Sequence, residues 1–179
     1  MPPLLRRARL EDVPALKALM NRAIRDLQTP FLSPAQIDAS FEVMGLDTQL
    51  VEDGTYFAVE LDGALAGCGG WSRRATLFGG DHSAGRSARL LDPAHEPARV
   101  RAMYVEPAFA RRGVGRAILE GAEAAARAEG FTHLELAATL AGAPLYRAYG
   151  FETIEPFEAV TSNGVAVPLI RMGKAVAPT

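Results

Sequence analysis

The sequence predicts an α/β (α+β) protein with a mixed, mostly antiparallel central sheet and helices on both faces. Two observations carry this prediction. Runs rich in β-branched and aromatic residues alternate along the chain with segments whose apolar residues recur at helical spacing. Two pairs of runs are joined by the tight-turn signals Asp62-Gly63 and Asn163-Gly164, and each signal predicts a hairpin. The expected element order is β-α-α-β-β-β-α-β-α-β-β.

The first half of the chain predicts two helices and then a hairpin. Ser33 before Pro34 is typical of a helix N-cap with proline at the first helical position. The glycines at 67, 69 and 70 lie within an expected strand, where they often mark the close approach of another backbone or a ligand. The expected elements are a strand over 4–9, helices over 12–27 and 34–44, and strands over 55–60 and 64–71.

The second half begins with a long connection over 72–97, which shows no clear period. Connections of that length in compact domains are usually functional or disordered. Gly130 and Gly150 are typical of residues that end helices. The expected elements after the connection are a strand over 100–105, a helix over 113–129, a strand over 131–137, a short helix over 144–149, and closing strands over 151–160 and 165–172.

Composition limits the classes of function. At 179 residues, the chain is expected to form a single domain over 1–179. The net charge of −2 gives no indication of nucleic acid or membrane binding. The one cysteine, Cys68, cannot form an internal disulfide, which fits a cytoplasmic location, and no apolar run is long enough for a signal peptide or a membrane helix. His82 and His95 lack the spacing of a metal site, so no metal is expected.

The segment Arg111-Arg112-Gly113-Val114-Gly115-Arg116 combines a basic cluster with glycines at the start of a helix. The first N–H groups of a helix are unpaired, and the helix dipole is positive at that end, so the segment suits a phosphate or pyrophosphate. The alternative is structural: solvated arginines, a turn glycine and a glycine for helix packing. The missing Gly-Lys-Ser/Thr triplet counts against a nucleotide-phosphate-binding protein of another fold.

Two motifs carry a family resemblance. Met103-Tyr104-Val105-Glu106-Pro107, followed by Arg111 to Arg116, resembles the acetyl-CoA-binding segment of the GNAT superfamily of N-acetyltransferases. Leu145-Tyr146-Arg147-Ala148-Tyr149-Gly150-Phe151 resembles the short helix and following strand of the same superfamily. The order of elements also matches, so the resemblance covers nearly the whole chain and implies a GNAT-like acetyltransferase fold. Two positions depart from the family pattern: Ala110 replaces the usual Gln or Arg of the loop, and Thr139 replaces an Asn.

The resemblance implies roles for particular residues. Met103, Tyr104 and Val105 would form a strand splayed from its neighbour, with backbone groups free for the pantetheine arm of acetyl-CoA. The segment from Arg111 to Arg116 would hold the pyrophosphate, and Thr139 would lie near the pantetheine. Tyr146 would protonate the departing thiolate, its alternative being a buried packing aromatic. Glu106 is a candidate general base, although a solvated turn residue is the ordinary role at that position.

The sequence therefore predicts an acetyl-CoA-dependent N-acetyltransferase that moves an acetyl group to a primary amine by direct attack, without an acyl-enzyme. The alternative is a non-catalytic acyl-CoA sensor on the same fold. The acceptor is expected to be a small-molecule amine or a peptide N-terminus. We expect Trp71 and Phe78 to line its site, and the 72–97 connection and the first two helices to select it. Such folds often form homodimers, but no residue in the sequence requires one.

Overall fold

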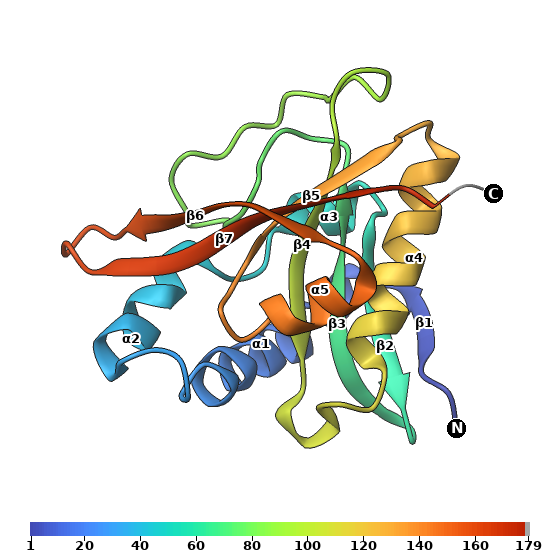
Figure 1. The fold of residues 1–179 in the computed structure, drawn as a ribbon. Coiled ribbons are helices and arrows are strands. Elements are labelled where there is room, and N and C mark those ends of the chain that lie inside the picture. Colours follow the sequence, from blue (N-terminus) through green and yellow to red (C-terminus); the bar gives the residue numbers. More distant parts are fainter. Residues whose placement is uncertain (178–179) are drawn as a thin grey trace.

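The computed structural model describes residues 1–177, which contain a single seven-stranded sheet (Figure 1). The strand order is β1-β2-β3-β4-β5-β7-β6. Only β4 and β5 run parallel, and every other neighbouring pair in the described residues is antiparallel. The strands are β1 Leu4–Arg7, β2 Tyr56–Leu61, β3 Ala64–Ser72, β4 Ala98–Val105, β5 His133–Ala138, β6 Glu152–Val160 and β7 Ala166–Ala175. The mixed, mostly antiparallel sheet is confirmed.

Helices cover both faces of the sheet, as predicted (Figure 1). On one face, Leu119 and Ala122 of α4 pack into a core with Trp71, Leu134 and Leu136 of the strands. On the other face, buried side chains of α1 and α3 pack against β2 and β3. The helices are α1 Val13–Leu27, α2 Pro34–Val43, α3 Thr48–Glu52, α4 Val114–Ala128 and α5 Ala143–Tyr149, with single 3₁₀ turns at Leu10–Asp12 and Pro107–Phe109.

The glycines of β3 let α4 lie very close to the sheet. A Cβ atom at Gly67 would lie 2.5 Å from Cγ1 of Val114, and one at Gly69 would lie 2.9 Å from Cγ2 of Ile118. Carbon atoms that are not bonded to each other cannot come this close. A side chain at Gly67 or Gly69 would therefore push α4 away from the sheet. At Gly70, a Cβ would overlap the carbonyl oxygen of Thr55, so the expected close approach of another backbone is found there, whereas side chains of α4 approach Gly67 and Gly69.

Two local predictions need correction. The sequence analysis missed α3, whose five residues are too few to show a helical period; its signal is Asp47, whose carboxylate accepts from the N–H of Gln49 as an N-cap. The first strand ends at Arg7 and does not continue to residue 9. The reason is Asp12, whose carboxylate accepts from the N–H of Arg9 at 2.7 Å and turns the chain into the first 3₁₀ turn.

The connection between β3 and β4 contains no helix, and its one β-bridge joins Arg74 to Leu90. It is nonetheless held at several points. The N–H of Ala75 donates to the carbonyl of Arg89, and the carboxylate of Asp81 accepts from the N–H of Thr48 at the start of α3. These bonds place residues 77–79 beside β4, on the face of the sheet that carries α1 to α3.

Candidate active site

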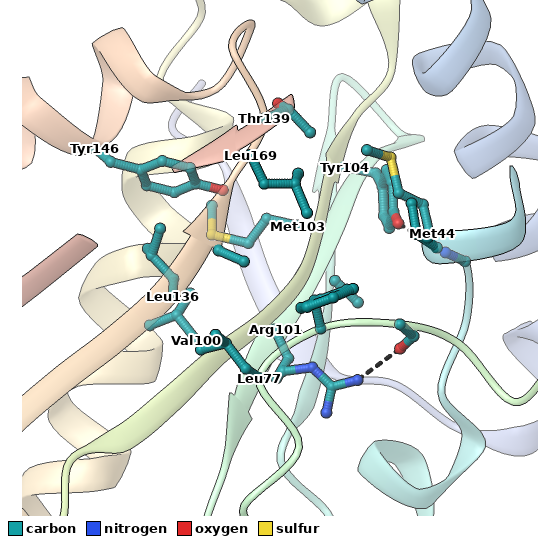
Figure 2. Close-up of a pocket in the computed structure, with 16 residues that line it drawn as sticks. Met44, Leu77, Val100, Arg101, Met103, Tyr104, Leu136, Thr139, Tyr146 and Leu169 are labelled. Carbon is teal, nitrogen blue, oxygen red and sulfur yellow. Dashed lines mark hydrogen bonds between the residues drawn. The ribbon is translucent and has the colours of Figure 1, made fainter. Parts of the chain in front are cut away.

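The parallel strands β4 and β5 separate soon after they begin. They pair only at Ala98 with Leu134 and at Arg99 with Glu135. Beyond Arg99, the backbone groups of β4 that face β5 have no strand partner in the described part of the chain. The splayed strand that the resemblance implied is therefore confirmed, and it opens the sheet between Met103 on one side and Thr139 on the other (Figure 2).

A cavity of about 80 Å³ lies at this opening (Figure 2). Its walls come from β4, β5, α5 and β7, from the residues that follow α2, and from the long connection. The lining residues are Val43, Met44, Gly45, Leu77, Phe78, Gly79, Val100, Arg101, Ala102, Met103, Tyr104, Leu136, Ala137, Thr139, Tyr146 and Leu169. Phe78 lines it as expected. Trp71 does not, because its ring is buried against Phe131 in the core under α4.

Ala102 forms a β-bulge in the middle of β4. Tyr104 lies opposite Cys68 and Arg101 lies opposite Gly70, so β4 has one residue more than β3 across this interval. Ala102 accordingly has a φ of 50°, a left-handed conformation that is strained for a residue with a Cβ. The hydroxyl of Tyr56 donates to the Ala102 carbonyl oxygen at 2.6 Å and holds the bulge in place.

The bulge decides which side chains face the cavity. In a regular strand, residues three apart point to opposite faces. Here Arg101 and Tyr104 share the face of α1 to α3, since Arg101 bonds to Asp47 and the Tyr104 hydroxyl accepts from the N–H of Gly45. Val100 and Met103 pack on the α4 face instead. One inserted residue thus brings an arginine and a phenol to the same wall.

Tyr146 extends from α5 into the opening. Figure 2 shows its ring directed from α5 toward Met103 and Leu169. The side chain is 9% exposed, and its hydroxyl has no hydrogen-bond partner among residues 1–177. Burial raises the pKa of Tyr146 above that of a free phenol, because the low dielectric disfavours the phenolate. Tyr146 is therefore a protonated, unpaired donor at neutral pH.

The turn before α4 presents several unpaired backbone donors. Gly113 is the N-cap with a φ of 84°, and Arg111 has a φ of 62°. Within the described chain, the N–H groups of residues 111–116 have no acceptor, and no side chain caps the helix. Alternating left- and right-handed residues at a helix start form a concave cluster of N–H groups, which is the usual geometry of an anion site.

The two glycines of this turn also have structural tasks. There is open space for a side chain at position 113. Glycine is favoured there because of the positive φ, which residues with a Cβ rarely adopt. At Gly115, a Cβ would lie 2.5 Å from Cδ2 of Leu145, so this glycine allows α4 to pack against α5. Val114 is buried behind the turn. Gly115 thereby also fixes the position of the helix that carries Tyr146.

The three arginines of the turn differ in their partners. Arg112 bonds to Asp62 and Arg116 to Glu120, both as exposed ion pairs. Arg111 is exposed and has no ion-pair partner in the described part of the chain. Exposed pairs of this kind contribute little stability, roughly 0–1 kcal/mol each, so they can exchange for another anion.

The sequence profile of the acetyltransferase (GNAT) family matches residues 20–151, which include β4, the turn and α5. The chain belongs to the GNAT acetyltransferase family. No curated relative matches the chain by sequence.

Many solved structures share the GNAT fold of this chain. A GCN5-related N-acetyltransferase from Rhodopseudomonas palustris is 20% identical, with a TM-score of 0.72 and coverage of 98% of this chain and 96% of that one. The putative acetyltransferase YncA from Salmonella typhimurium, solved with its cofactor acetyl-CoA, is 18% identical, with a TM-score of 0.65 and coverage of 100% and 96%. PaiA N-acetyltransferase from Thermoplasma acidophilum, solved with coenzyme A, is 13% identical, with a TM-score of 0.64 and coverage of 98% and 99%.

Thr139 and Ala110 are the positions at which the resemblance implied a departure from the family pattern. The Thr139 hydroxyl accepts from the N–H of Gly142 at 3.0 Å and so helps to form the turn into α5. Ala110 precedes the turn with an extended backbone, and it offers no side-chain contact. The unpaired donors at the start of α4 are consequently backbone N–H groups.

Glu106 and Val105 lie at the end of β4, and neither lines the cavity. Val105 packs with the α4 face of the core. The Glu106 carboxylate makes a two-pronged ion pair with Arg22 of α1, with a shortest distance of 2.6 Å. This pair ties α1 to the end of β4. The catalytic assignment of Glu106 remains a prediction.

Sequence reasoning missed Arg101 and Asp47. Arg101 is only 2% exposed, and its Nη2 donates to the carboxylate of Asp47 and to the carbonyl of Gly79. The signal was an arginine inside the apolar run from Val100 to Val105. A charged residue in a buried strand is rare unless it is paired or functional. Its partner could not be found by spacing, because it lies 54 residues away.

No group of three or more His, Cys, Asp or Glu side chains in residues 1–177 could hold a metal ion. None of the helices in the same range is long and apolar enough to cross a membrane.

Proposed function

We propose that this GNAT chain is an acetyl-CoA-dependent N-acetyltransferase that moves the acetyl group to a primary amine by direct attack. The observation that carries the proposal is the opening between β4 and β5, with the unpaired hydroxyl of Tyr146 directed into it. Such an opening brings a proton donor and free backbone groups to one place, which is what acyl transfer from a thioester requires.

The chain offers candidate places for the pyrophosphate and for the pantetheine arm of acetyl-CoA. The N–H groups of residues 111–116 suit the pyrophosphate, and Arg111 adds a free positive charge. The backbone groups of the segment from Met103 to Val105 that face β5 have no strand partner in the described chain, and they suit the amide groups of the pantetheine arm. Thr139, on the opposite wall of the opening, lies beside that arm. YncA and PaiA bind acetyl-CoA and coenzyme A on the same fold, which supports this placement.

Acetyl-CoA, once bound, would supply an activated thioester that an amine attacks directly. An unpaired N–H of β4 stabilises the negative charge that develops on the carbonyl oxygen as the C–N bond forms. Tyr146 gives its proton to the sulfur as the C–S bond breaks, leaving an amide and a free thiol. Its raised pKa keeps the phenol protonated at neutral pH, so the hydroxyl is available as the proton donor when the sulfur leaves.

The amine must lose a proton before or during attack. Among residues 1–177, no Asp, Glu or His lines the cavity, so water in the opening would accept this proton. Glu106 is the alternative acceptor, but its pairing with Arg22 engages the carboxylate. The acceptor class is a small-molecule amine or a peptide N-terminus. A cytoplasmic location belongs to the same proposal, because the single buried thiol of Cys68 requires no oxidising compartment.

Calorimetric titration with acetyl-CoA and an amine panel with detection of the released thiol test the proposal together. We expect saturable binding of acetyl-CoA and thiol release that depends on both the amine and Tyr146. Absence of acetyl-CoA binding would contradict the proposal. Binding without turnover of any amine would favour a non-catalytic acyl-CoA sensor.

A further inference from the structure

Arg101 is a buried guanidinium with unused hydrogen-bonding capacity. Its side chain is 1% exposed, and only Nη2 is engaged, with Asp47 at 3.1 Å and Gly79 at 2.6 Å. Within residues 1–177, neither Nε nor Nη1 has an acceptor. An arginine carries five N–H donors, and leaving buried donors unpaired costs free energy. The unpaired donors therefore need an acceptor that the chain itself does not provide.

The neighbours of Arg101 do not neutralise it fully. Its partner Asp47 is shared with Arg86, so one buried carboxylate serves two guanidinium groups. Asp81 lies 4.0 Å from Arg86, and its side chain is 43% exposed, so it is not a buried counter-charge. Burial works against the charge of Arg101 and lowers its pKa, with Asp47 acting in the opposite direction. An additional anion at the buried end would stabilise the guanidinium.

Arg101 lies in the wall of the cavity at the β4–β5 opening. Among the lining residues of the described chain it is the only one with a formal charge at neutral pH, and no Asp or Glu shares the cavity. The bulge at Ala102 aims it to the face of α1 to α3, the side bordered by residues 43–45 and 77–79. Arg101 thus places unsatisfied positive charge on the acceptor side of the proposed active site.

We propose that the acetyl acceptor is an amine that also carries a carboxylate, of the amino-acid type, and that Arg101 binds this carboxylate. The inference rests on the proposed function and names its substrate class. A carboxylate accepts from the unpaired Nε–H and Nη1–H groups while the amine faces the opening near Tyr146. Polyamines are disfavoured, because the cavity offers a second ammonium no carboxylate partner. A protein N-terminus is disfavoured as well, since its neighbouring carbonyl is an uncharged amide.

The test compares amino acids with their carboxamides as acceptors. For each pair, kcat/KM is measured by thiol release in the wild type and in Arg101→Gln. We expect the wild type to favour the acid, and the acid-to-amide ratio to fall at least about tenfold in Arg101→Gln. An amino acid and its carboxamide differ in amine basicity, but this difference is the same for both proteins and cancels when their acid-to-amide ratios are compared. Arg74→Gln is the matched control, because Arg74 is also held by an aspartate, Asp53, but lies outside the cavity. Its ratio should equal that of the wild type.

An acid-to-amide ratio that is the same in the wild type and Arg101→Gln would overturn the inference and leave the proposed function standing. If Arg101→Gln does not fold, Arg101→Lys is measured in its place. Its acid-to-amide ratio of kcat/KM should be lower than that of the wild type but greater than one. If the wild type binds acetyl-CoA but acetylates no amine, the proposed function fails. The carboxylate site is then judged separately by thermal shift: N-acetylalanine should stabilise the wild type with CoA more than N-acetylalanine methylamide does, and equal shifts would overturn it.

Discussion

The hydroxyl of Tyr56 donates a 2.6 Å hydrogen bond to the carbonyl oxygen of Ala102, at the bulge of β4. Tyr56 comes from β2, and its ring is fully buried. The bond therefore reaches from inside the core to the one strained residue of the cavity wall, whose φ is 50°. The bulge directs both Arg101 and Tyr104 toward the cavity. Tyr56, which does not line the cavity, therefore helps to position two residues that do.

Tyr56→Phe should lower the free energy of unfolding by about 1–3 kcal/mol, because the part-buried carbonyl of Ala102 loses its partner. Denaturant unfolding measures this change. We also expect a lower kcat, since the bulge is no longer fixed. Ala102→Gly is the matched control: it keeps the carbonyl and removes the steric strain, so its stability should stay within about 1 kcal/mol of the wild type. Equal stabilities of Tyr56→Phe and the wild type would contradict the positioning role.

Gly113→Ala should lower mainly the stability of the protein, whereas Gly115→Ala should lower mainly kcat. Gly113→Ala places a Cβ at a positive φ with open space around it, so about 1 kcal/mol of stability should be lost and little else should move. Gly115→Ala forces Leu145 and α5 to shift, so kcat should fall more than in Gly113→Ala. Adding Leu145→Ala should restore part of that kcat. A double variant no better than Gly115→Ala would argue against steric conflict as the cause.

Stability should decline in alkaline solution partly through Cys68. Burial raises the pKa of its thiol from 9.0 to about 12. The folded state thus holds a proton that the unfolded state has lost, so this contribution is intact below about pH 9 and is lost as the pH rises toward 12. Across that interval, Cys68→Ala should lose stability less steeply than the wild type, by about 1.4 kcal/mol per pH unit. Parallel curves of stability against pH would show that the thiol does not contribute.

The ion pair between Glu106 and Arg22 offers a direct test of the general base. If Glu106 only ties α1 to β4, Glu106→Gln and Arg22→Gln should each change kcat less than about tenfold and should resemble each other in pH profile. A general base would behave otherwise: Glu106→Gln alone would lower kcat by about a hundredfold or more. Initial-rate kinetics from acidic to alkaline pH distinguish the two roles.

The sequence predicted most of the fold because its signals are local. Helical periods, the hairpin turns at Asp62-Gly63 and Asn163-Gly164, and the proline after Ser33 all act over a few residues. The short helix α3 was not predicted, because five residues are too few to show a helical period. Trp71 was assigned to the acceptor side because its strand ends there, whereas the long-range packing with Phe131 places it in the core.

The site was predictable only where a motif marked it. The turn from Arg111 to Arg116 and the helix of Tyr146 were found through the family resemblance. The bulge at Ala102 could not be found, because it depends on register against β3 and on a hydroxyl supplied from β2. The partnership of Arg101 with Asp47 was hidden for the same reason, as the fold alone brings them together.

The central claim is that Tyr146 protonates the leaving thiolate, and Tyr146→Phe tests it most directly. Calorimetry with acetyl-CoA and the pH dependence of kcat should be measured together on the wild type and this variant. We predict similar affinity for acetyl-CoA in both proteins and a kcat about 10²- to 10⁴-fold lower in the variant. In the wild type, the raised pKa of Tyr146 should keep the proton donor intact through mildly alkaline pH. An unchanged kcat for Tyr146→Phe across the pH range would contradict the account.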